Sequence, residues 1–191
     1  MNAPRPPQPV AVLFDRDGTL IEDVPYNGDP DRVALLPGAV EALELLRLRG
    51  VRTGVVSNQS GVGRGLLTAR QVLAVNLRVD ELLGGLDVWE FCPHAPDAGC
   101  PCRKPRPGLV LAAARRLGVD PRRCAVVGDI AADLGAAEAA GATGVLVPNA
   151  ATRPREVAAA RHRHPDLPSA VRALLGEEPA ARPAAPAGRW S

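Results

Sequence analysis

Short apolar runs alternate along the chain with longer segments in which apolar residues recur at helical spacing. Five runs predict strands, at residues 10–14, 51–56, 88–91, 124–127 and 144–147. Four segments predict helices, at residues 38–49, 68–83, 108–117 and 131–140. Strands that alternate with helices indicate βαβ units, so we predict an α/β fold with a parallel sheet covered by helices on both faces.

Length and composition change this picture little. The 191 residues are 46% apolar and 23% charged, which fits one globular domain, predicted for residues 10–176. The Pro-rich residues 1–9 predict a flexible N-terminus, and the Ala- and Pro-rich residues 177–191 predict a disordered tail. A net charge of +2 and the short apolar runs give no reason to expect a nucleic-acid or membrane partner. We therefore expect a monomeric, cytoplasmic protein.

The first strand is followed directly by Asp15-Arg16-Asp17-Gly18-Thr19. Two carboxylates this close repel each other unless a cation lies between them or one of them is protonated. The pair therefore predicts a Mg²⁺ site, acid–base chemistry or both, although Asp and Gly are also common in turns. A calcium loop is disfavoured because apolar residues occupy its later ligand positions.

Three more polar clusters follow predicted strands. They are Ser57-Asn58-Gln59-Ser60-Gly61-Val62-Gly63-Arg64-Gly65, Arg103-Lys104-Pro105, and Gly128-Asp129 with Asp133 one helical turn later. Each cluster alone is also typical of a solvated turn. Because the carboxyl ends of parallel strands meet at one edge of a sheet, their joint placement favours a phosphate-binding active site there.

Three of the four cysteines lie close together with a histidine. The segment Cys92-x-His94-x5-Cys100-x-Cys102 offers three thiolates and an imidazole, which match a closed, structural zinc site. The alternatives are a disulfide, which is unusual in the cytoplasm, and free thiols. Cys124 lies in a predicted strand and is interpreted as a buried apolar residue.

Taken together, the Asp pair, the Ser, the Lys and the late Gly-Asp resemble the four motifs of the haloacid dehalogenase superfamily of phosphotransferases. The resemblance spans residues 10–147 and implies a Rossmann-like fold. It implies that Asp15 attacks phosphorus and that Asp17 exchanges a proton with the leaving group and then with water. It also implies that Ser57 and Lys104 stabilise the phosphoryl group.

The same resemblance implies the cofactors. Mg²⁺ would be held by the Asp15 carboxylate, the Asp17 backbone carbonyl and Asp129, whereas Asp133 would position Lys104 or a metal-bound water. Zn²⁺ would be held by Cys92, His94, Cys100 and Cys102. The zinc loop leads directly into Arg103 and Lys104, so we expect it to hold these cations in place.

Within the superfamily, the zinc loop and the first motif are similar to two phosphatase families. These are the D-glycero-D-manno-heptose 1,7-bisphosphate 7-phosphatases and the histidinol-phosphate phosphatases, and the segments 60–65 and 102–108 are more similar to the first. This resemblance implies a sugar bisphosphate substrate. It implies substrate contacts from Asp23, Tyr26, Asn58, Gln59, Ser60 and Arg103.

Some features leave alternatives open. Ile130 stands where Lys or Ser is frequent, which removes a polar contact near the metal or substrate. Histidinol phosphate is the alternative substrate, and a non-catalytic phosphate- or protein-binding member is the alternative class. The segments between motifs are too short for a large cap domain, so we expect an open site walled by loops.

Overall fold

The computed structural model describes residues 8–177 and contains one five-stranded parallel sheet. The spatial order is β3-β2-β1-β4-β5, with β1 at the centre. The strands are β1 (Ala11–Phe14), β2 (Arg52–Asn58), β3 (Val88–Cys92), β4 (Cys124–Gly128) and β5 (Thr143–Leu146). The predicted α/β class and parallel sheet are confirmed. The predicted flexible and disordered ends lie, apart from residues 8, 9 and 177, outside the described residues.

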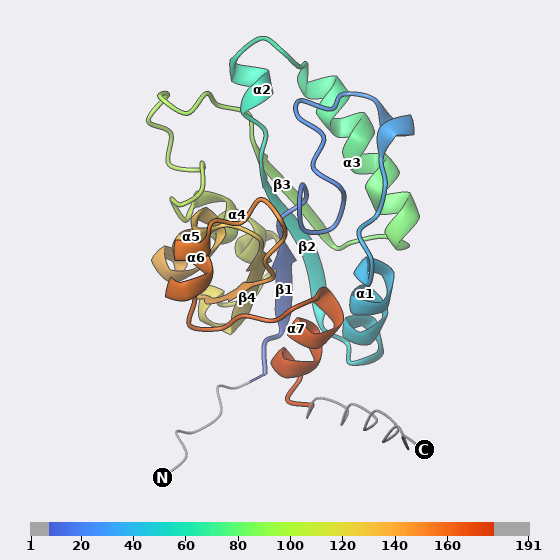
Figure 1. Cartoon of the computed structure of the whole chain (residues 1–191), viewed down its shortest axis with the longest axis vertical. Helices are drawn as coiled ribbons and strands as arrows, with labels where there is room; N and C mark the ends of the chain where they lie inside the picture. The colour runs from blue at the N-terminus through green and yellow to red at the C-terminus, as the bar shows by residue number, and fades with distance from the viewer. Residues whose placement is uncertain (1–7, 178–191) are drawn as a thin grey trace, which may run out of the picture.

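Helices cover both faces of the sheet (Figure 1). Helices α4 (Gly108–Leu117) and α5 (Ala131–Ala140) pack on one face, where they meet Ala11 and Leu13 of β1. Helices α1 (Ala39–Leu48), α3 (Ala69–Leu83) and α7 (Leu167–Leu174) pack on the other face, where they meet Val12 and Phe14. Successive residues of β1 thus pack alternately into the two apolar layers on either side of the sheet, as expected for a strand buried on both faces.

Helix α3 shows how the sequence sets an element's limits. Thr68 caps its first turn and forms a capping box with Gln71, and Gly84 ends it in a left-handed conformation. Its buried face is formed by Val72, Val75, Asn76, Val79 and Leu83. Asn76 is the polar member of this otherwise apolar face.

Several short helices were not predicted from the sequence. They are α2 (Ser60–Gly63), α6 (Pro154–Ala159), α7, and 3-10 turns at Pro30–Arg32 and Pro121–Arg123. Helix α6 has no buried residue, so it carries no apolar periodicity to detect. Helix α7 is amphipathic, but its eight residues give only two turns of pattern.

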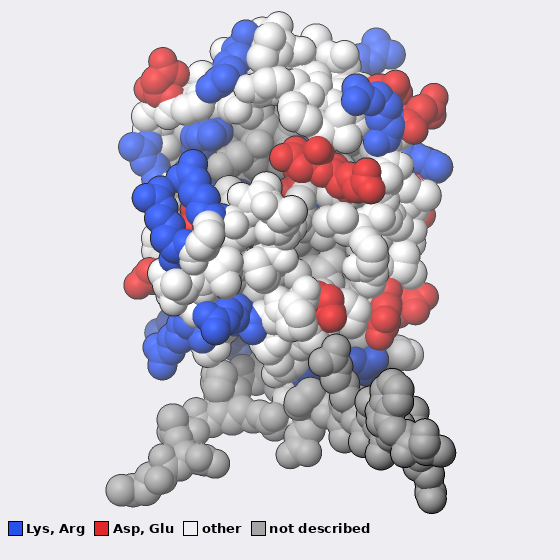
Figure 2. Space-filling view, viewed as in Figure 1, with Lys and Arg blue, Asp and Glu red and all other residues white. Residues whose placement is uncertain are grey.

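The carboxyl edge of the sheet is walled by loops and short helices. Within residues 8–177 the connections at this edge are 15–38, 59–68, 93–107, 129–130 and 147–153, and none forms a separate domain, as expected. The space-filling view shows a hollow in the upper half, with Lys and Arg gathered on the left and Asp and Glu to the right of the hollow (Figure 2). No helix among the described residues is long and apolar enough to cross a membrane.

Candidate active site

The sheet register brings the first and last motifs together. Phe14 of β1 pairs with Val127 of β4, and the Asp15 backbone N–H donates to the Val127 carbonyl at 2.9 Å. Strand order reverses between these neighbours, since β2 follows β1 on one side and β5 follows β4 on the other. Such a switch point opens a crevice at the carboxyl ends of the strands, and Asp15 and Asp129 lie there.

Two glycines make the close approach possible. A side chain at Gly128 would place its Cβ 2.2 Å from Asp133 Oδ2, and one at Gly18 would lie 2.7 Å from Asp129 Oδ2. Gly18 also has a φ of +79°, which L side chains rarely adopt. The glycines of both motifs are therefore required for the carboxylates to pack.

Lys104 is the cation of the site. Its Nζ lies 2.6 Å from Asp15 Oδ1, 2.5 Å from Asp133 Oδ1 and 2.7 Å from the Val56 carbonyl oxygen. The contacts with Asp15 and Val56 are hydrogen bonds, and the contact with Asp133 is an ion pair. Asp133, which is fully buried, is thus paired with Lys104, which fits one of the two roles expected for it.

Burial and crowded charges shift the pKa values of these groups. Burial lowers the pKa of Lys104, but the carboxylates of Asp133 and Asp15 outweigh it, so the net pKa is raised. Burial raises the pKa of Asp15 to about 8, opposed by Lys104 and reinforced by Asp133 and Asp17. Burial also raises the pKa of Asp129 to about 6, reinforced by Asp133. When all three are ionised, Asp15, Asp129 and Asp133 therefore carry more negative charge than Lys104 neutralises.

That excess charge and the oxygen ligands fit a hard divalent cation. Carboxylate oxygens of Asp15, Asp129 and Asp133 lie within 4.8 Å of one another. Asp133 is already engaged, because Oδ1 contacts Lys104 and Oδ2 accepts from the Ile130 backbone N–H at 3.3 Å. Asp15 and Asp129 are therefore the carboxylates left to hold Mg²⁺, an ion that prefers oxygen ligands.

Residues that were not predicted orient Asp129. Asn149 Nδ2 donates to Asp129 Oδ2 at 2.8 Å and to the Gly18 carbonyl at 3.0 Å. Thr152 Oγ1 donates to the Asp129 carbonyl at 2.7 Å, and Thr19 Oγ1 lies 3.4 Å from Asp129 Oδ1. Asn149 and Thr152 follow β5, so their position after the last strand was the available signal in the sequence.

Asp17 is held by side chains from two segments. Arg16 donates to it through Nη2 at 3.0 Å and Nε at 3.2 Å. Gln59 Nε2 donates to Asp17 Oδ2 at 2.7 Å and to Ser57 Oγ at 2.8 Å. Gln59, predicted as a substrate ligand, thus links the second carboxylate to the serine in this structure. Its substrate contact stays a prediction.

The predicted substrate residues line a single cavity of about 400 Å³ above these groups. They are Asp23, Tyr26, Asn58, Gln59, Ser60 and Arg103, and Ile130 lines the cavity with them. The same cavity is lined by Asp15, Asp17, Ser57, Asn58, Gln59, Lys104 and Asp129. The structure therefore brings together every residue predicted for phosphate transfer, although their roles in binding stay predictions.

Three residues that line the cavity, Tyr26, Asn58 and Asp23, have contacts or charges that shape the site. Tyr26 has a φ of +52°, which is uncommon outside glycine, and its hydroxyl accepts from Arg64 Nη1 at 2.9 Å. Asn58 forms two hydrogen bonds with the backbone of Lys104. Its Nδ2 donates to the Lys104 carbonyl at 3.2 Å, and its Oδ1 accepts from the Lys104 N–H at 3.1 Å. Burial and the charge of Asp17 raise the pKa of Asp23. Asn58 therefore fastens the loop that carries Lys104 to the end of β2.

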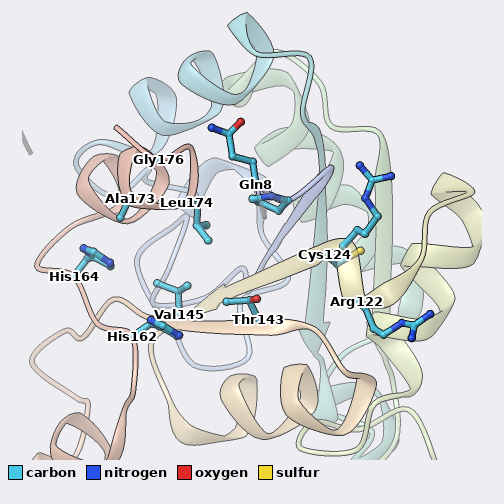
Figure 3. Close-up of a pocket in the computed structure, with 12 residues that line it drawn as sticks. Gln8, Arg122, Cys124, Thr143, Val145, His162, His164, Ala173, Leu174 and Gly176 are labelled. Carbon is cyan, nitrogen blue, oxygen red and sulfur yellow. The ribbon is translucent and has the colours of Figure 1, made fainter. Parts of the chain in front are cut away.

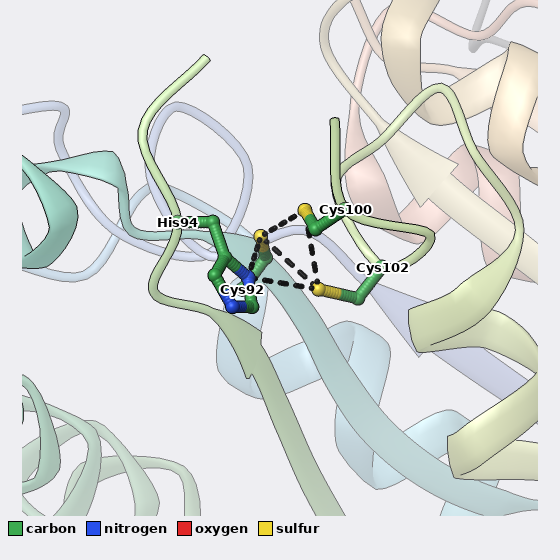
Figure 4. Close-up of side chains that lie close together, drawn as sticks. All are labelled: Cys92, His94, Cys100 and Cys102. Carbon is green, nitrogen blue, oxygen red and sulfur yellow. Dashed lines mark hydrogen bonds between the residues drawn. The ribbon is translucent and has the colours of Figure 1, made fainter. Parts of the chain in front are cut away.

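The predicted zinc ligands converge on one point (Figure 4). The three Sγ atoms of Cys92, Cys100 and Cys102 lie 3.3 to 3.6 Å apart. His94 Nδ1 lies 3.5 Å from Cys92 Sγ and 3.3 Å from Cys102 Sγ. A tetrahedron with Zn–S bonds of about 2.3 Å has edges of about 3.8 Å, so the four atoms need to move only slightly to hold zinc.

A second cavity lies at the opposite edge of the sheet (Figure 3). It measures about 320 Å³ and is lined by the first residues of β4 and β5, Cys124 and Thr143, together with Val145 and Leu174. His162 and His164 lie at its side, and burial lowers the pKa of His164. None of the predicted site residues lines it.

Comparisons with known proteins agree with this geometry. Residues 24–141 match the model of the haloacid dehalogenase-like hydrolases. The D-glycero-beta-D-manno-heptose-1,7-bisphosphate 7-phosphatase of Yersinia pestis is 38% identical over 149 residues, which cover 72% of this chain and 79% of the relative. The protein of that name from Bordetella bronchiseptica is 37% identical over 141 residues, covering 71% and 79%.

Solved structures give the same result. The crystal structure of D,D-heptose 1,7-bisphosphate phosphatase from B. bronchiseptica, complexed with magnesium and phosphate, matches with a TM-score of 0.77 and 33% identity over 87% of this chain and 98% of that one. A HAD-like phosphatase from Mesorhizobium loti matches with a TM-score of 0.71 and 34% identity over 91% of each chain. The chain therefore belongs to the haloacid dehalogenase-like hydrolases and, among them, to the D-glycero-beta-D-manno-heptose-1,7-bisphosphate 7-phosphatase family.

Proposed function

We propose that this chain hydrolyses the 7-phosphate of D-glycero-beta-D-manno-heptose 1,7-bisphosphate through a phosphoryl group carried on Asp15. The observation that carries the proposal is the position of Asp15. Its carboxylate lies at the switch point of the sheet, 2.6 Å from Lys104 Nζ, and lines the cavity that the substrate-site loops enclose. The names of the relatives support the choice of substrate.

The first step is attack of an Asp15 oxygen on phosphorus. Lys104, Ser57 and the backbone at the carboxyl edge face the charge that spreads over the phosphoryl oxygens. As the bond from phosphorus to the sugar oxygen breaks, Asp17 gives its proton to that oxygen. The products of this step are the heptose 1-phosphate and phosphorylated Asp15.

The second step returns the enzyme to its starting state. Asp17, now a carboxylate, takes a proton from a water molecule that attacks the phosphorus. Phosphate leaves, and Asp15 is again free. Mg²⁺, held by Asp15, the Asp17 carbonyl and Asp129, would neutralise charge so that an anionic nucleophile can approach an anionic substrate.

The walls of the cavity account for recognition of the second phosphate. Arg103 lines the cavity, and no group among residues 8–177 accepts a hydrogen bond from its buried Nη1 atom. A buried guanidinium N–H without an acceptor is costly, and a phosphate oxygen would satisfy it. Ile130 is 37% exposed beside the same cavity and offers only apolar contact. Arg103 is therefore our candidate for the distal phosphate.

We further propose that Cys92, His94, Cys100 and Cys102 hold a structural Zn²⁺. The loop between β3 and α4 contains neither helix nor strand, and it carries Arg103 and Lys104 into the site. Zinc would fasten this loop next to the two cations. Thiolate ligands of this kind persist in a reducing compartment, which is consistent with the expected cytoplasmic location.

The proposal is tested by phosphate release with Mg²⁺ from four substrates at matched concentrations. These are the beta and alpha anomers of the heptose 1,7-bisphosphate, histidinol phosphate and p-nitrophenyl phosphate, with Asp15→Asn as the blank. We expect the highest kcat/KM for the beta bisphosphate, with heptose 1-phosphate as the product. A preference for histidinol phosphate would overturn the substrate assignment, and equal rates with Asp15→Asn would overturn the site.

A further inference from the structure

The side chain of Arg16, between two active-site aspartates in the sequence, is buried in the protein. Arg16 is 1% exposed to solvent, and its side chain is the largest of the fully buried side chains within residues 8–177. A buried cation must be paired and hydrogen-bonded to be tolerated. Arg16 meets this requirement with Asp17 on one side of its guanidinium group and with Asn76 on the other.

Asn76 lies 60 residues away in the middle of helix α3. It is 6% exposed, on a face otherwise formed by valines and a leucine that pack in the core. Its Oδ1 accepts a hydrogen bond from Arg16 Nη1 at 2.6 Å. A polar residue on this face is explained by that bond, since packing alone would favour an apolar side chain.

The contacts of Asp17 are unequal at its two oxygens. Oδ2 accepts from Arg16 Nη2 at 3.0 Å and from Gln59 Nε2 at 2.7 Å. Oδ1 accepts from Arg16 Nε at 3.2 Å. The plane of the carboxylate is therefore fixed by the guanidinium fork, and Oδ1 is the oxygen with fewer hydrogen-bond partners.

We propose that Arg16 and Asn76 form a positioning pair that aims Oδ1 of Asp17 at the leaving-group oxygen. The inference rests on the proposed function, in which Asp17 protonates that oxygen as the phosphorus–oxygen bond breaks and a bond to Asp15 forms. Asn76 fixes the guanidinium group, and the guanidinium group fixes the carboxylate. Neither Arg16 nor Asn76 exchanges a proton itself.

The test compares two substrates whose leaving groups differ in their need for a proton. The sugar oxygen that leaves from a sugar phosphate must be protonated as its bond to phosphorus breaks. The oxygen of p-nitrophenyl phosphate can leave without a proton, as p-nitrophenolate. The quantity measured is kcat/KM with Mg²⁺, because it covers the steps up to phosphorylation of Asp15 and excludes the later attack of water. The substitution is Asn76→Leu, which has a similar volume and suits a helix.

We expect Asn76→Leu to lower kcat/KM for the heptose bisphosphate by about 10- to 100-fold, a part of the 10²–10⁴ that acid–base catalysis supplies. The value for p-nitrophenyl phosphate should stay within about threefold of wild type. Asn76→Asp keeps the acceptor oxygen, so its kcat/KM for the heptose bisphosphate should be close to that of wild type. Val75→Ala is the matched control on α3, since Val75 is buried beside Asn76 but has no polar contact with Arg16.

Equal losses on both substrates would overturn the proposal, because a general disturbance of the fold does not depend on the leaving group. Arg16→Lys provides a second route if Asn76→Leu does not fold, since it keeps the charge but removes the fork, and we expect the same selectivity for leaving groups. Wild-type enzyme that releases phosphate from neither substrate would instead overturn the proposed function itself.

Discussion

The two edges of the sheet carry cavities of similar size and different chemistry. The cavity at the carboxyl edge measures about 400 Å³ and is lined by Asp15, Asp17, Asp129 and Lys104. The cavity at the amino edge measures about 320 Å³, and its lining includes Cys124, Thr143 and Val145 of two strands. Volume therefore does not distinguish them, whereas buried charge does.

The difference follows from the direction of parallel strands. Each strand leaves the core at its carboxyl end, where the next residues are free to be polar and to converge with those of its neighbours. Asp15 and Asp129 are such residues, and each directly follows one of two strands that pair with each other. At the amino edge, the cavity is lined by the first residues of β4 and β5. These residues are part of the sheet, so their side chains pack against neighbouring elements.

The largest expected effect is a loss of turnover that occurs at the carboxyl edge and not at the amino edge. Asp15→Asn should lower turnover by roughly 10⁴-fold or more, because the amide cannot act as the nucleophile. The fold should be unchanged, since the amide keeps the shape of the carboxylate. Phosphate release and thermal unfolding check both statements. Asp120→Asn, the same change near the amino edge, should leave turnover intact, and a comparable loss there would remove the contrast.

The cysteines allow a second contrast. Cys102→Ser should abolish bound zinc and lower turnover by about 100-fold, the cost of shifting catalytic groups by about 1 Å, since the loop would no longer hold Lys104. Cys124→Ala, at the amino edge, should keep one zinc per chain and normal turnover. Elemental analysis and phosphate release on both variants give the answer. Wild-type protein without zinc would contradict the assignment of the cluster.

Mg²⁺ should stabilise the protein in a pH-dependent way. In Mg²⁺-free protein the pKa values of Asp15, about 8, and Asp129, about 6, are raised above those of an unfolded chain. The folded state then binds more protons between about pH 4 and pH 8, so its stability decreases as pH rises through this window. Mg²⁺ bound to the ionised carboxylates opposes that loss.

We therefore expect Mg²⁺, at one concentration of about 100 times its Kd at pH 8, to raise Tm by about 5–10 °C at pH 8 and by less at pH 5. The Mg²⁺-free sample is prepared by dialysis without a chelator, so that zinc is retained. Comparing the Mg²⁺-induced shift at each pH cancels titrations elsewhere in the chain. An equal shift at both pH values would contradict the raised pKa values.

The smallest expected effect on activity is at the amino edge. Val145→Ala removes two methyl groups from a buried strand residue and should cost about 1–2 kcal/mol of unfolding free energy. Its kcat and KM should match those of wild type, because Val145 lies at the cavity that holds no buried charge. A change in KM without a change in Tm would show that the two edges are coupled.

Sequence reasoning predicted Asp15, Ser57 and Asp129 because each lies within a few positions of a strand end, whereas Lys104 lies far along the loop after β3 and was predicted from the resemblance to the family motifs. The apolar runs located β1 and β4, and the direct pairing of these two strands, which the structure shows, brings Asp15 and Asp129 together. Asn149 and Thr152 were not predicted, because their contacts with Asp129 depend on the path of the loop after β5. Asn76 was not predicted for a similar reason, since a single polar residue on an apolar helix face does not identify its partner.

The central claim is that the phosphoryl group passes through Asp15 while Asp17 handles the proton. Asp17→Asn enzyme with Mg²⁺ and p-nitrophenyl phosphate tests it most directly, because this leaving group needs no acid but the second step still needs a base. We predict a burst of one p-nitrophenolate per active site, followed by a stall with one phosphoryl group on Asp15. Absence of the burst, or a phosphoryl group on another residue, would contradict the account.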